Sequence, residues 1–387
     1  MAETGAIGVA RRRVDGEGKV RGATRFAADL PIHGLLHSRL VLAAEVHGRI
    51  VRIDADAALA VPGVVAVLTA DDLPIVDGAG GRAGQPLARS EIVYSGQPVA
   101  MVVAETETAA EDGVDQVVVE VDPLPPVVDV EAAMAPGAAA ARVDAAAGDG
   151  ADVGAAHAEA GGGDAGGEEE ELSDNVAGTQ RMAAGDAGAL LADGGVSAAA
   201  RFSTSWIHQG YLEPQVATAW LEPEGELVVS TSTQGAFSTR QQIADLLGLS
   251  HDRVRVRPAP LGGAFGGKLM IVEPLVAAAV WRLRRPVRLA MTRMEDFAAT
   301  NPAPGQVIEL EAGATAEGRL TAVRGRIVID RGSNDEFGLE ALAATLTSGP
   351  YRWDAHEMRA YGVLTNRVGF GAYRAPTAPP SAYAIES

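Results

Sequence analysis

Two strand–helix–strand patterns follow one another between residues 226 and 292, and no other feature constrains the fold as strongly. In the first, an apolar strand at 226–232 leads to a helix at 238–247, which stops at Gly248, and then to alternating residues at 253–257. In the second, a helix at 273–283 with Pro274 near its first turn leads to a strand at 286–292. Such repeats are typical of open α/β sheets, which bind ligands where their strands end.

The segment before residue 130 carries shorter strand signals. Apolar runs separated by Gly, Pro and Asp predict strands at 35–42, 64–68, 98–104 and 116–121, with a short helix at 105–113. They predict an α+β domain over residues 15–130. Beyond the second strand–helix–strand pattern, further strands are predicted at 319–330, hairpin-like after Gly318, and at 358–364.

Residues 132–171 separate these two parts of the chain. Their 40 positions hold 16 Ala, 9 Gly and 9 acidic residues, and no Leu, Ile, Phe, Tyr or Trp, so we expect them to bury no core. The composition predicts a flexible or partly helical acidic linker, and an acidic interaction tail is the alternative. The predicted division is therefore 15–130, a linker at 131–175, and a second domain at 176–387.

Charge and cysteine content exclude several classes of function. The formal net charge of -19 disfavours nucleic acids and acidic membrane surfaces as partners. No apolar run is long enough to span a membrane, and the basic residues 11–13 are followed by VDGE at 14–17 rather than by an apolar signal core, so a cytoplasmic protein is expected. The absence of cysteine excludes thiolate zinc sites, iron–sulfur clusters and a cysteine nucleophile within the chain. His33, His37 and His47 have no recognisable ligand spacing, so no metal site is expected from them.

A glycine-rich loop, GGAFGGK at 262–268, lies between a predicted strand and a predicted helix. Its backbone amides could approach an anion, which favours either a nucleotide or another anionic cofactor, whereas a tight turn chosen for packing is the plain alternative. The loop also fits the G-x-x-x-x-G-K pattern of nucleotide triphosphatases. However, Leu269 stands where that pattern needs a Ser or Thr hydroxyl for magnesium.

Two further loops carry polar side chains suited to a ligand. Gln234 follows the strand at 226–232, and its amide could grip an oxo group or a cofactor amide, or it could be an ordinary turn residue. Arg374 lies in the loop 369–376 among Gly and Pro residues, where it could orient a planar or anionic substrate or form a surface ion pair.

Together these motifs resemble the molybdenum-cofactor-binding chain of the xanthine dehydrogenase and aldehyde oxidase family, the molybdenum hydroxylases. The motifs that carry the resemblance are GEGKVRG at 16–22 with FAAD at 26–29, LLHS at 35–38, YSGQPVA at 94–100, HQGYLEP at 208–214, TQ at 233–234, GGAFGGK, and GAYRAP at 371–376. The implied fold class is α+β, with an N-terminal α/β hammerhead domain followed by the first half of the molybdopterin-binding domain. The resemblance covers nearly the whole chain outside the linker.

The resemblance also implies a cofactor, a reaction and site residues. A molybdenum ion would be held by the dithiolene sulfurs of a pyranopterin, in its plain or its cytosine dinucleotide form, so the protein would supply no metal ligand. Gln234 would bond near the molybdenum oxo group, and the loop residues Gly263, Ala264, Phe265 and Gly266 would line the metal. Arg374 and Leu269 would face the substrate. The implied reaction hydroxylates an aldehyde or an N-heteroaromatic ring with oxygen taken from water.

Three departures from the family pattern limit these expectations. Leu269 stands where purine-oxidising relatives carry a Glu, which disfavours a xanthine-type substrate, and Ala375 stands where carbon monoxide dehydrogenases carry the copper-binding Cys. The general-base glutamate of the family belongs to a motif that is not matched here. Glu213, Glu273 and Glu340 lie near apolar segments, and none of them is assigned as the base.

The expected assembly follows from these departures. An iron–sulfur subunit, an FAD subunit and a complementary C-terminal molybdopterin-binding chain would complete the enzyme, and removing them would expose apolar surface. Three interpretations remain open at this point. The chain is a subunit of such an enzyme acting on a small molecule, a non-catalytic truncated remnant of the family, or a nucleotide-binding protein that uses the loop 262–268.

Overall fold

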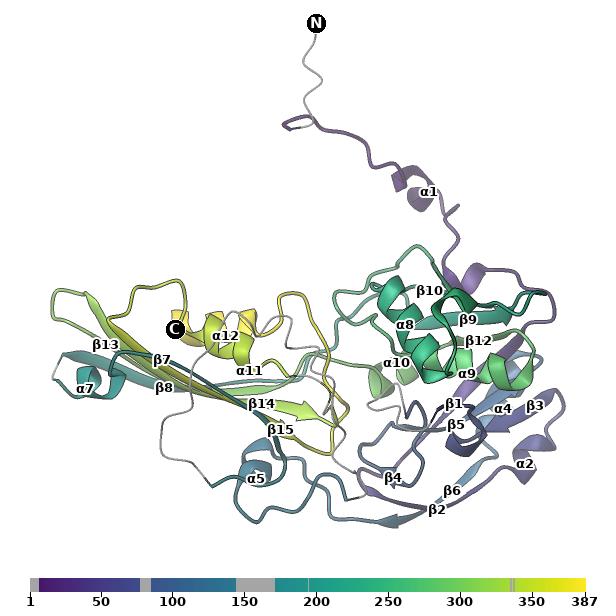
Figure 1. The fold of residues 1–387 in the computed structure, drawn as a ribbon, viewed down its shortest axis with the longest axis horizontal. Coiled ribbons are helices and arrows are strands. Elements are labelled where there is room, and N and C mark those ends of the chain that lie inside the picture. The colour runs from purple at the N-terminus through teal and green to yellow at the C-terminus, as the bar shows by residue number, and fades with distance from the viewer. Residues whose placement is uncertain (1–6, 77–84, 144–170, 194, 335, 337) are drawn as a thin grey trace, which may run out of the picture.

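The computed structural model describes residues 7–76, 85–143 and 171–387, except 194, 335 and 337. Figure 1 shows two lobes, one built around each of the two larger β-sheets. An N-terminal arm that carries helix α1 (Gly16–Val20) projects away from both. Among the described residues, three short 3-10 helices occur: η1 (Ala27–Asp29), η2 (Ala70–Asp72) and η3 (His251–Arg253).

The first lobe contains a mixed sheet of seven strands. In sheet order they are β11 (Val254–Pro258), β10 (Leu227–Thr231), β9 (Val216–Leu221), β12 (Val287–Ala290), β1 (Leu36–Leu42), β5 (Pro98–Ala104) and β3 (Val64–Leu68). Strands β10 and β11 are parallel neighbours joined by helix α8 (Ala236–Leu246), which confirms the first strand–helix–strand prediction. The second is confirmed by helix α9 (Glu273–Leu283), which joins β11 to β12 on the far side of β9.

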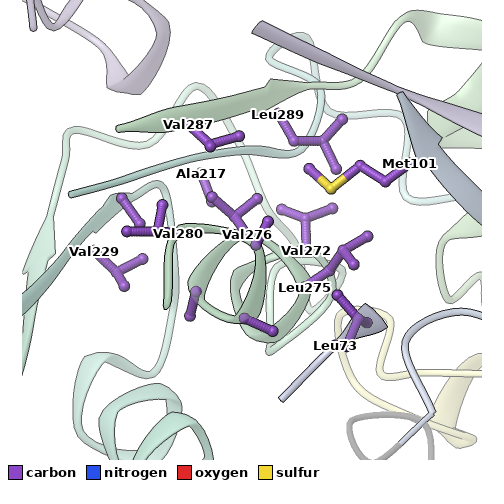
Figure 2. Close-up of a cluster of buried hydrophobic side chains, with 14 of the residues drawn as sticks. Leu73, Met101, Ala217, Val229, Val272, Leu275, Val276, Val280, Val287 and Leu289 are labelled. Carbon is purple, nitrogen blue, oxygen red and sulfur yellow. The ribbon is translucent and has the colours of Figure 1, made fainter. Parts of the chain in front are cut away.

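Helix α9 forms the centre of the first lobe's core. Figure 2 shows its Leu275, Val276 and Val280, with the N-cap residue Val272, directed at side chains of the sheet, including Ala217, Val229, Val287 and Leu289. Helix α8 begins at Ala236, two residues earlier than predicted, because Gly235 rather than a Ser or Thr occupies the N-cap position. Its predicted stop is confirmed, since Gly248 adopts a positive φ of 62° directly after the helix.

The seven-stranded sheet joins the two predicted domains. Strands β1, β5 and β3 come from residues 15–130, and β1 pairs in parallel with β12 from the later segment. A three-stranded sheet, β4 (Glu91–Ile92), β2 (Gly48–Asp54) and β6 (Val118–Pro123), completes the N-terminal part together with α2 (Asp56–Leu59) and α4 (Glu107–Val114). Hydrogen bonding in the sheet therefore runs across the predicted boundary.

The second lobe contains an antiparallel and parallel mixture of five long strands. In sheet order they are β7 (Val176–Ala184), β15 (Ala355–Leu364), β14 (Leu320–Gly332), β13 (Gln306–Ala314) and β8 (Val196–Thr204). β13 and β14 form the predicted hairpin around Gly318. Helices α11 (Glu340–Thr347) and α12 (Ala378–Glu386) cover one face, while α5 (Val130–Met134) and α7 (Ala187–Ala192) contact the other (Figure 1).

A buried ion pair lies between the five-stranded sheet and helix α11. Arg331 Nε and Nη2 donate to the two carboxylate oxygens of Glu340, both at 2.9 Å, and the two residues are 5% and 7% exposed. Gly178, Gly338 and Gly362 surround the pair, and a Cβ at any of these positions would collide with it. These glycines therefore leave the space that the two long side chains fill.

The start of the predicted linker differs from expectation. Residues 130–134 form α5, whose Ala133 and Met134 are buried with Ala141 against Val328 and Tyr361 of the five-stranded sheet. The low apolar content of the linker did not prevent this packing because alanine and one methionine suffice beside a preformed sheet face. Residues 144–170 of the predicted linker lie outside the described part of the chain. Among the described residues, no helix has the length and apolar character needed to cross a bilayer.

Candidate functional site

The three loops singled out in the sequence meet beside the first lobe. Gln234, which follows β10, accepts a hydrogen bond from the Gly266 amide at 3.0 Å through its side-chain oxygen, and its own backbone amide donates to the Lys268 carbonyl at 2.9 Å. The Arg374 backbone amide donates to the Phe265 carbonyl at 2.9 Å. The glycine loop 262–268 is thus held between the two other loops, and Leu269 lies close to Gly235 beside Gln234.

Unusual backbone conformations are concentrated in these loops. Among the described residues, five non-glycine residues have positive φ, and four of them, Phe265, Met270, Ala375 and Thr377, belong to the glycine loop region or to the loop facing it. Gly266 has φ 106°, and a Cβ there would collide with the Ala372 carbonyl. Strain of this kind persists only where the surroundings impose it, and it clusters at functional sites.

The tip of the glycine loop presents unused hydrogen-bond donors. The amides of Gly263, Ala264 and Phe265 make no hydrogen bond within the described part of the chain. Consecutive free amides at a turn attract anions and oxo groups. The Gly266 amide differs from these three amides, because it already donates a hydrogen bond to the side-chain oxygen of Gln234. Its role in the structure is to fix the loop.

Two side chains add donors beside this tip. Gln234 is exposed, and its side-chain nitrogen makes no hydrogen bond within the described residues because only its oxygen is used by the loop. Arg374 is also exposed, and its guanidinium forms no ion pair with a described residue. Each of these side chains is therefore free to meet a ligand.

Lys268, the last residue of the loop, is directed into the protein. Its side chain is fully buried, and its ammonium donates to Glu213 Oε2 at 2.6 Å and to Ser232 Oγ at 3.2 Å. It also lies 5.0 Å from the centre of the Tyr211 ring. Burial lowers the pKa of the Lys268 ammonium, and the Glu213 carboxylate opposes that shift. Helix α9 starts only at Glu273, so neither the lysine nor a helix N-terminus is placed to bind a phosphate as in a triphosphatase.

A buried polar network supports the loop from beneath. Asp296 in helix α10 (Arg293–Ala299) accepts the Tyr211 hydroxyl at 2.9 Å, and Gln215 donates to the Tyr211 hydroxyl at 2.9 Å and to the Gly267 carbonyl at 2.6 Å. Burial and the Asp296 carboxylate raise the pKa of Tyr211 far above its ordinary value. Sequence reasoning assigned no role to these residues, although Tyr211 belongs to the HQGYLEP motif.

The three acids left unassigned in the sequence all have partners in the structure. Glu213 binds Lys268, and Glu340 binds Arg331. Glu273 is buried at the start of α9, where it bonds to Thr231 Oγ1 at 2.9 Å and accepts the amides of Ile271 and Val272. Burial raises the pKa of Glu273. None of the three therefore presents a free carboxylate at the loop tip.

Apolar side chains remain exposed on the segments that border the loop. Leu212, Phe237 and Met294 are each more than 80% exposed, and Phe265 and Phe297 are about half exposed. Arg293 contacts two of them, because it donates to the Leu212 carbonyl and lies over the Phe297 ring. A gathering of large apolar side chains around a ligand site is typical of an interface.

Within the described residues, no group of His, Cys, Asp or Glu could hold a metal ion. Of the three N-terminal histidines, His47 is buried and contacts Glu91 and the Pro125 carbonyl, and His37 lies 3.4 Å from Glu107.

Two family models match the chain. The model described as molybdopterin cofactor-binding domain matches residues 168–387, and the model described as aldehyde oxidase and xanthine dehydrogenase, a/b hammerhead domain, matches residues 21–125. Together with the similar solved structures, they confirm the expected fold class, a hammerhead domain followed by molybdopterin-binding structure.

Similar proteins include oxidoreductases of several substrates. The carbon monoxide dehydrogenase large chain of Hydrogenophaga pseudoflava is 31% identical over 92% of this chain and 44% of its own length. The nicotinate dehydrogenase large molybdopterin subunit of Eubacterium barkeri is 26% identical over 95% of this chain and 81% of its own length. Carbon monoxide dehydrogenase from Oligotropha carboxidovorans matches with a TM-score of 0.84 and 27% identity, over 98% of this chain and 47% of that one. The chain thus spans less than half of the two carbon monoxide dehydrogenase chains.

Proposed function

Since this chain belongs to the aldehyde oxidase and xanthine dehydrogenase family of molybdenum hydroxylases, we propose that it is the part of such an enzyme that holds one side of the molybdenum cofactor. The observation that carries the proposal is the row of free amides at Gly263, Ala264 and Phe265 beside the free side-chain nitrogen of Gln234. When bound, a molybdenum pyranopterin supplies the redox centre that accepts two electrons while water provides the oxygen of the product.

The donors at the loop suit such a group. Oxo and phosphate oxygens accept hydrogen bonds, and the loop tip offers three backbone donors. The cofactor's own dithiolene sulfurs would hold the metal, which matches a site without protein metal ligands among the described residues. Gln234 and the amides of residues 263–265 would bind the cofactor, and Gly266 would keep the loop against Ala372. The cytosine dinucleotide form of the cofactor is part of the same proposal.

Arg374 and Leu269 would face the substrate. The Arg374 guanidinium is free and lies on the loop whose backbone holds Phe265, so it can orient a planar polar ring or an aldehyde oxygen. Leu269 adds an apolar surface near Gln234. We propose an aldehyde or an N-heteroaromatic compound as the substrate. Carbon monoxide is disfavoured because Ala375 supplies no thiolate for copper.

The exposed apolar side chains around the loop favour an assembly. We propose that Leu212, Phe265 and Met294, with their neighbours Phe237 and Phe297, contact a complementary molybdopterin-binding chain that supplies the other side of the cofactor and the general base. An iron–sulfur subunit and an FAD subunit would carry electrons away, because this chain has no cysteine for clusters. We propose a cytoplasmic location.

The position of Lys268 argues against the nucleotide-binding alternative. That alternative requires the Lys268 ammonium at the ligand, whereas that group is buried beneath the loop and paired with Glu213. The other alternative, a non-catalytic remnant of the family, is tested by the measurement of molybdenum content described next.

The test is the molybdenum content of the protein isolated gently from its native cell with its co-purifying chains, measured by elemental mass spectrometry. We expect about one molybdenum per chain, as one cofactor site requires. A Gln234→Ala variant should retain the fold and lose molybdenum, whereas Gln242→Ala, on the helix that follows, should retain both. A complex that contains its partner chains but no molybdenum would contradict the proposal and favour the remnant.

A further inference from the structure

One carboxylate oxygen binds both ends of the glycine loop. Glu213 Oε2 accepts the backbone amide of Gly262, the first residue of the loop, at 2.8 Å, and the ammonium of Lys268, the last residue, at 2.6 Å. The Glu213 amide donates in turn to the Gly262 carbonyl at 3.2 Å. The segment between the two ends must therefore arch away from Glu213.

The arch contains unusual backbone conformations. Gly263 and Gly266 have φ values of 98° and 106°, and between them Phe265 has a φ of 53°, which a non-glycine residue rarely adopts. A loop free to relax would leave that conformation, because it costs about 1–3 kcal/mol in a non-glycine residue. The ties at its two ends keep it in place.

The Lys268–Glu213 ion pair lies beneath the surface of the protein. Lys268 is fully buried and Glu213 is mostly buried, so the pair has lost most of its contact with water. A buried pair gives little net stability compared with apolar residues of similar size, which makes a purely stabilising role a poor explanation for it. What the pair does provide is a fixed distance between residues 262 and 268.

We propose that Lys268 and Glu213 are positioning residues of the cofactor loop, and that their ion pair beneath the loop keeps the amides of residues 263–265 in the conformation that leaves them available to a ligand. Neither side chain contacts the ligand. The inference rests on the proposed function for the identity of that ligand, but the arrangement itself is a property of this chain.

The experiment compares two variants that each break one buried ion pair. Lys268→Met keeps the apolar stem and removes the ammonium beneath the loop. Arg331→Met does the same to the pair with Glu340, which lies in the other lobe. Hydrogen–deuterium exchange of the peptide covering residues 262–268 is measured in the complete complex, together with thermal unfolding and the molybdenum content.

We expect Lys268→Met to raise the exchange of the loop peptide at least about tenfold, which corresponds to roughly 1.4 kcal/mol of local stability. Molybdenum content should fall with it. Arg331→Met should lower the unfolding temperature and leave loop exchange at the wild-type value. Unchanged loop exchange in folded Lys268→Met, or an equal rise in Arg331→Met, would overturn the inference.

Glu213→Gln decides the matter if Lys268→Met does not fold. The amide oxygen of Gln still accepts the Gly262 amide, so only the ionic tie to Lys268 is lost. Loop exchange should again rise, by less than in Lys268→Met, and wild-type exchange would overturn the inference. A wild-type complex that lacks molybdenum would overturn the proposed function instead, since the exchange comparison needs no cofactor.

Discussion

Each lobe contains a buried ion pair between a glutamate and a long basic side chain, and the two pairs have different neighbours. Arg331 and Glu340 meet through two parallel hydrogen bonds inside a rigid enclosure of three glycines on strands and a short turn. Lys268 and Glu213 meet through one oxygen that also binds a loop amide. The first pair is surrounded by regular structure, whereas the second touches backbone that is held in strained conformations. The Arg331–Glu340 pair thus contributes to packing in the second lobe, whereas the Lys268–Glu213 pair contributes to the geometry of a loop in the first.

The largest effect that sharpens this contrast is expected from Glu340→Gln. The substitution leaves Arg331 buried without a counter-charge, which costs about 3–5 kcal/mol. Urea unfolding should show this loss, while exchange of residues 262–268 stays at the wild-type level. A change of loop exchange in this variant would show that the two lobes are coupled and that the contrast fails.

Gly266→Ala should have the next largest effect. It places a Cβ against the Ala372 carbonyl at a positive φ, and the backbone strain alone costs about 1–3 kcal/mol. We expect the two loops to separate and the molybdenum content to fall. Gly318→Ala is the matched control, because Gly318 has a φ of 87° in the β13–β14 hairpin with open space around it. The two variants should differ in molybdenum content even where their unfolding midpoints are similar.

A smaller, pH-dependent effect is expected from Glu273→Gln. The Thr231 hydroxyl lies within hydrogen-bond distance of both the Val216 carbonyl and Glu273, and it has one proton to give. A protonated Glu273 resolves this conflict by donating to Thr231, in agreement with the raised pKa of that carboxyl. Since the native state keeps a proton that the unfolded chain releases, Glu273 makes the free energy of unfolding fall as pH rises above about 4.5, the ordinary glutamate pKa.

Glutamine resembles the protonated carboxyl, so Glu273→Gln should remove this part of the pH dependence. Urea unfolding of wild type and variant between pH 4 and pH 8 measures the difference. Asp330 in the second lobe is a second buried acid with which Glu273 can be compared. Burial raises the pKa of Asp330 as well, but Thr365, Gly332 and Trp206 all donate hydrogen bonds to it and oppose that shift. Identical pH profiles for wild type and Glu273→Gln would contradict the assignment of a buried proton.

The smallest effect on stability is expected from Arg374→Ala. The side chain is exposed and forms no ion pair with a described residue, so the free energy of unfolding should change by less than about 0.5 kcal/mol. Turnover of the substrate should nevertheless fall, mainly through a higher KM. A large loss of stability would mean that Arg374 holds the loop rather than the substrate.

The sequence predicted the first lobe better than the second. Both crossovers around α8 and α9 were visible because their strands are β-branched and their helices end at Gly or begin near Pro. Strands β7 and β8 gave no comparable signal, because they are rich in Ala, Ser and Gly and lie at the sheet edges. Gly178 and Gly362 weaken the strand pattern, and they are present to admit the Arg331–Glu340 pair.

The site was predicted in part. Gln234, the glycine loop and Arg374 were expected from motifs, and the structure brings these three loops together. The support beneath them was missed, since Tyr211, Gln215 and Asp296 are separated by up to 85 positions and no spacing rule joins them. Lys268 shows the converse, because it matches the lysine of a phosphate-loop pattern, whereas the structure buries its ammonium beneath the loop.

The parallel pairing of β1 with β12 limits which segments can be exchanged between relatives of this chain during evolution. A hammerhead segment from a relative that replaces residues 21–125 of this chain would have to present an edge strand that pairs with β12. That strand would need to be in register with Val287, Arg288 and Leu289. A break between the two matched segments would leave β1 and β12 each with an open edge, and open edges aggregate. The two segments are therefore expected to be inherited, recombined and expressed as one unit.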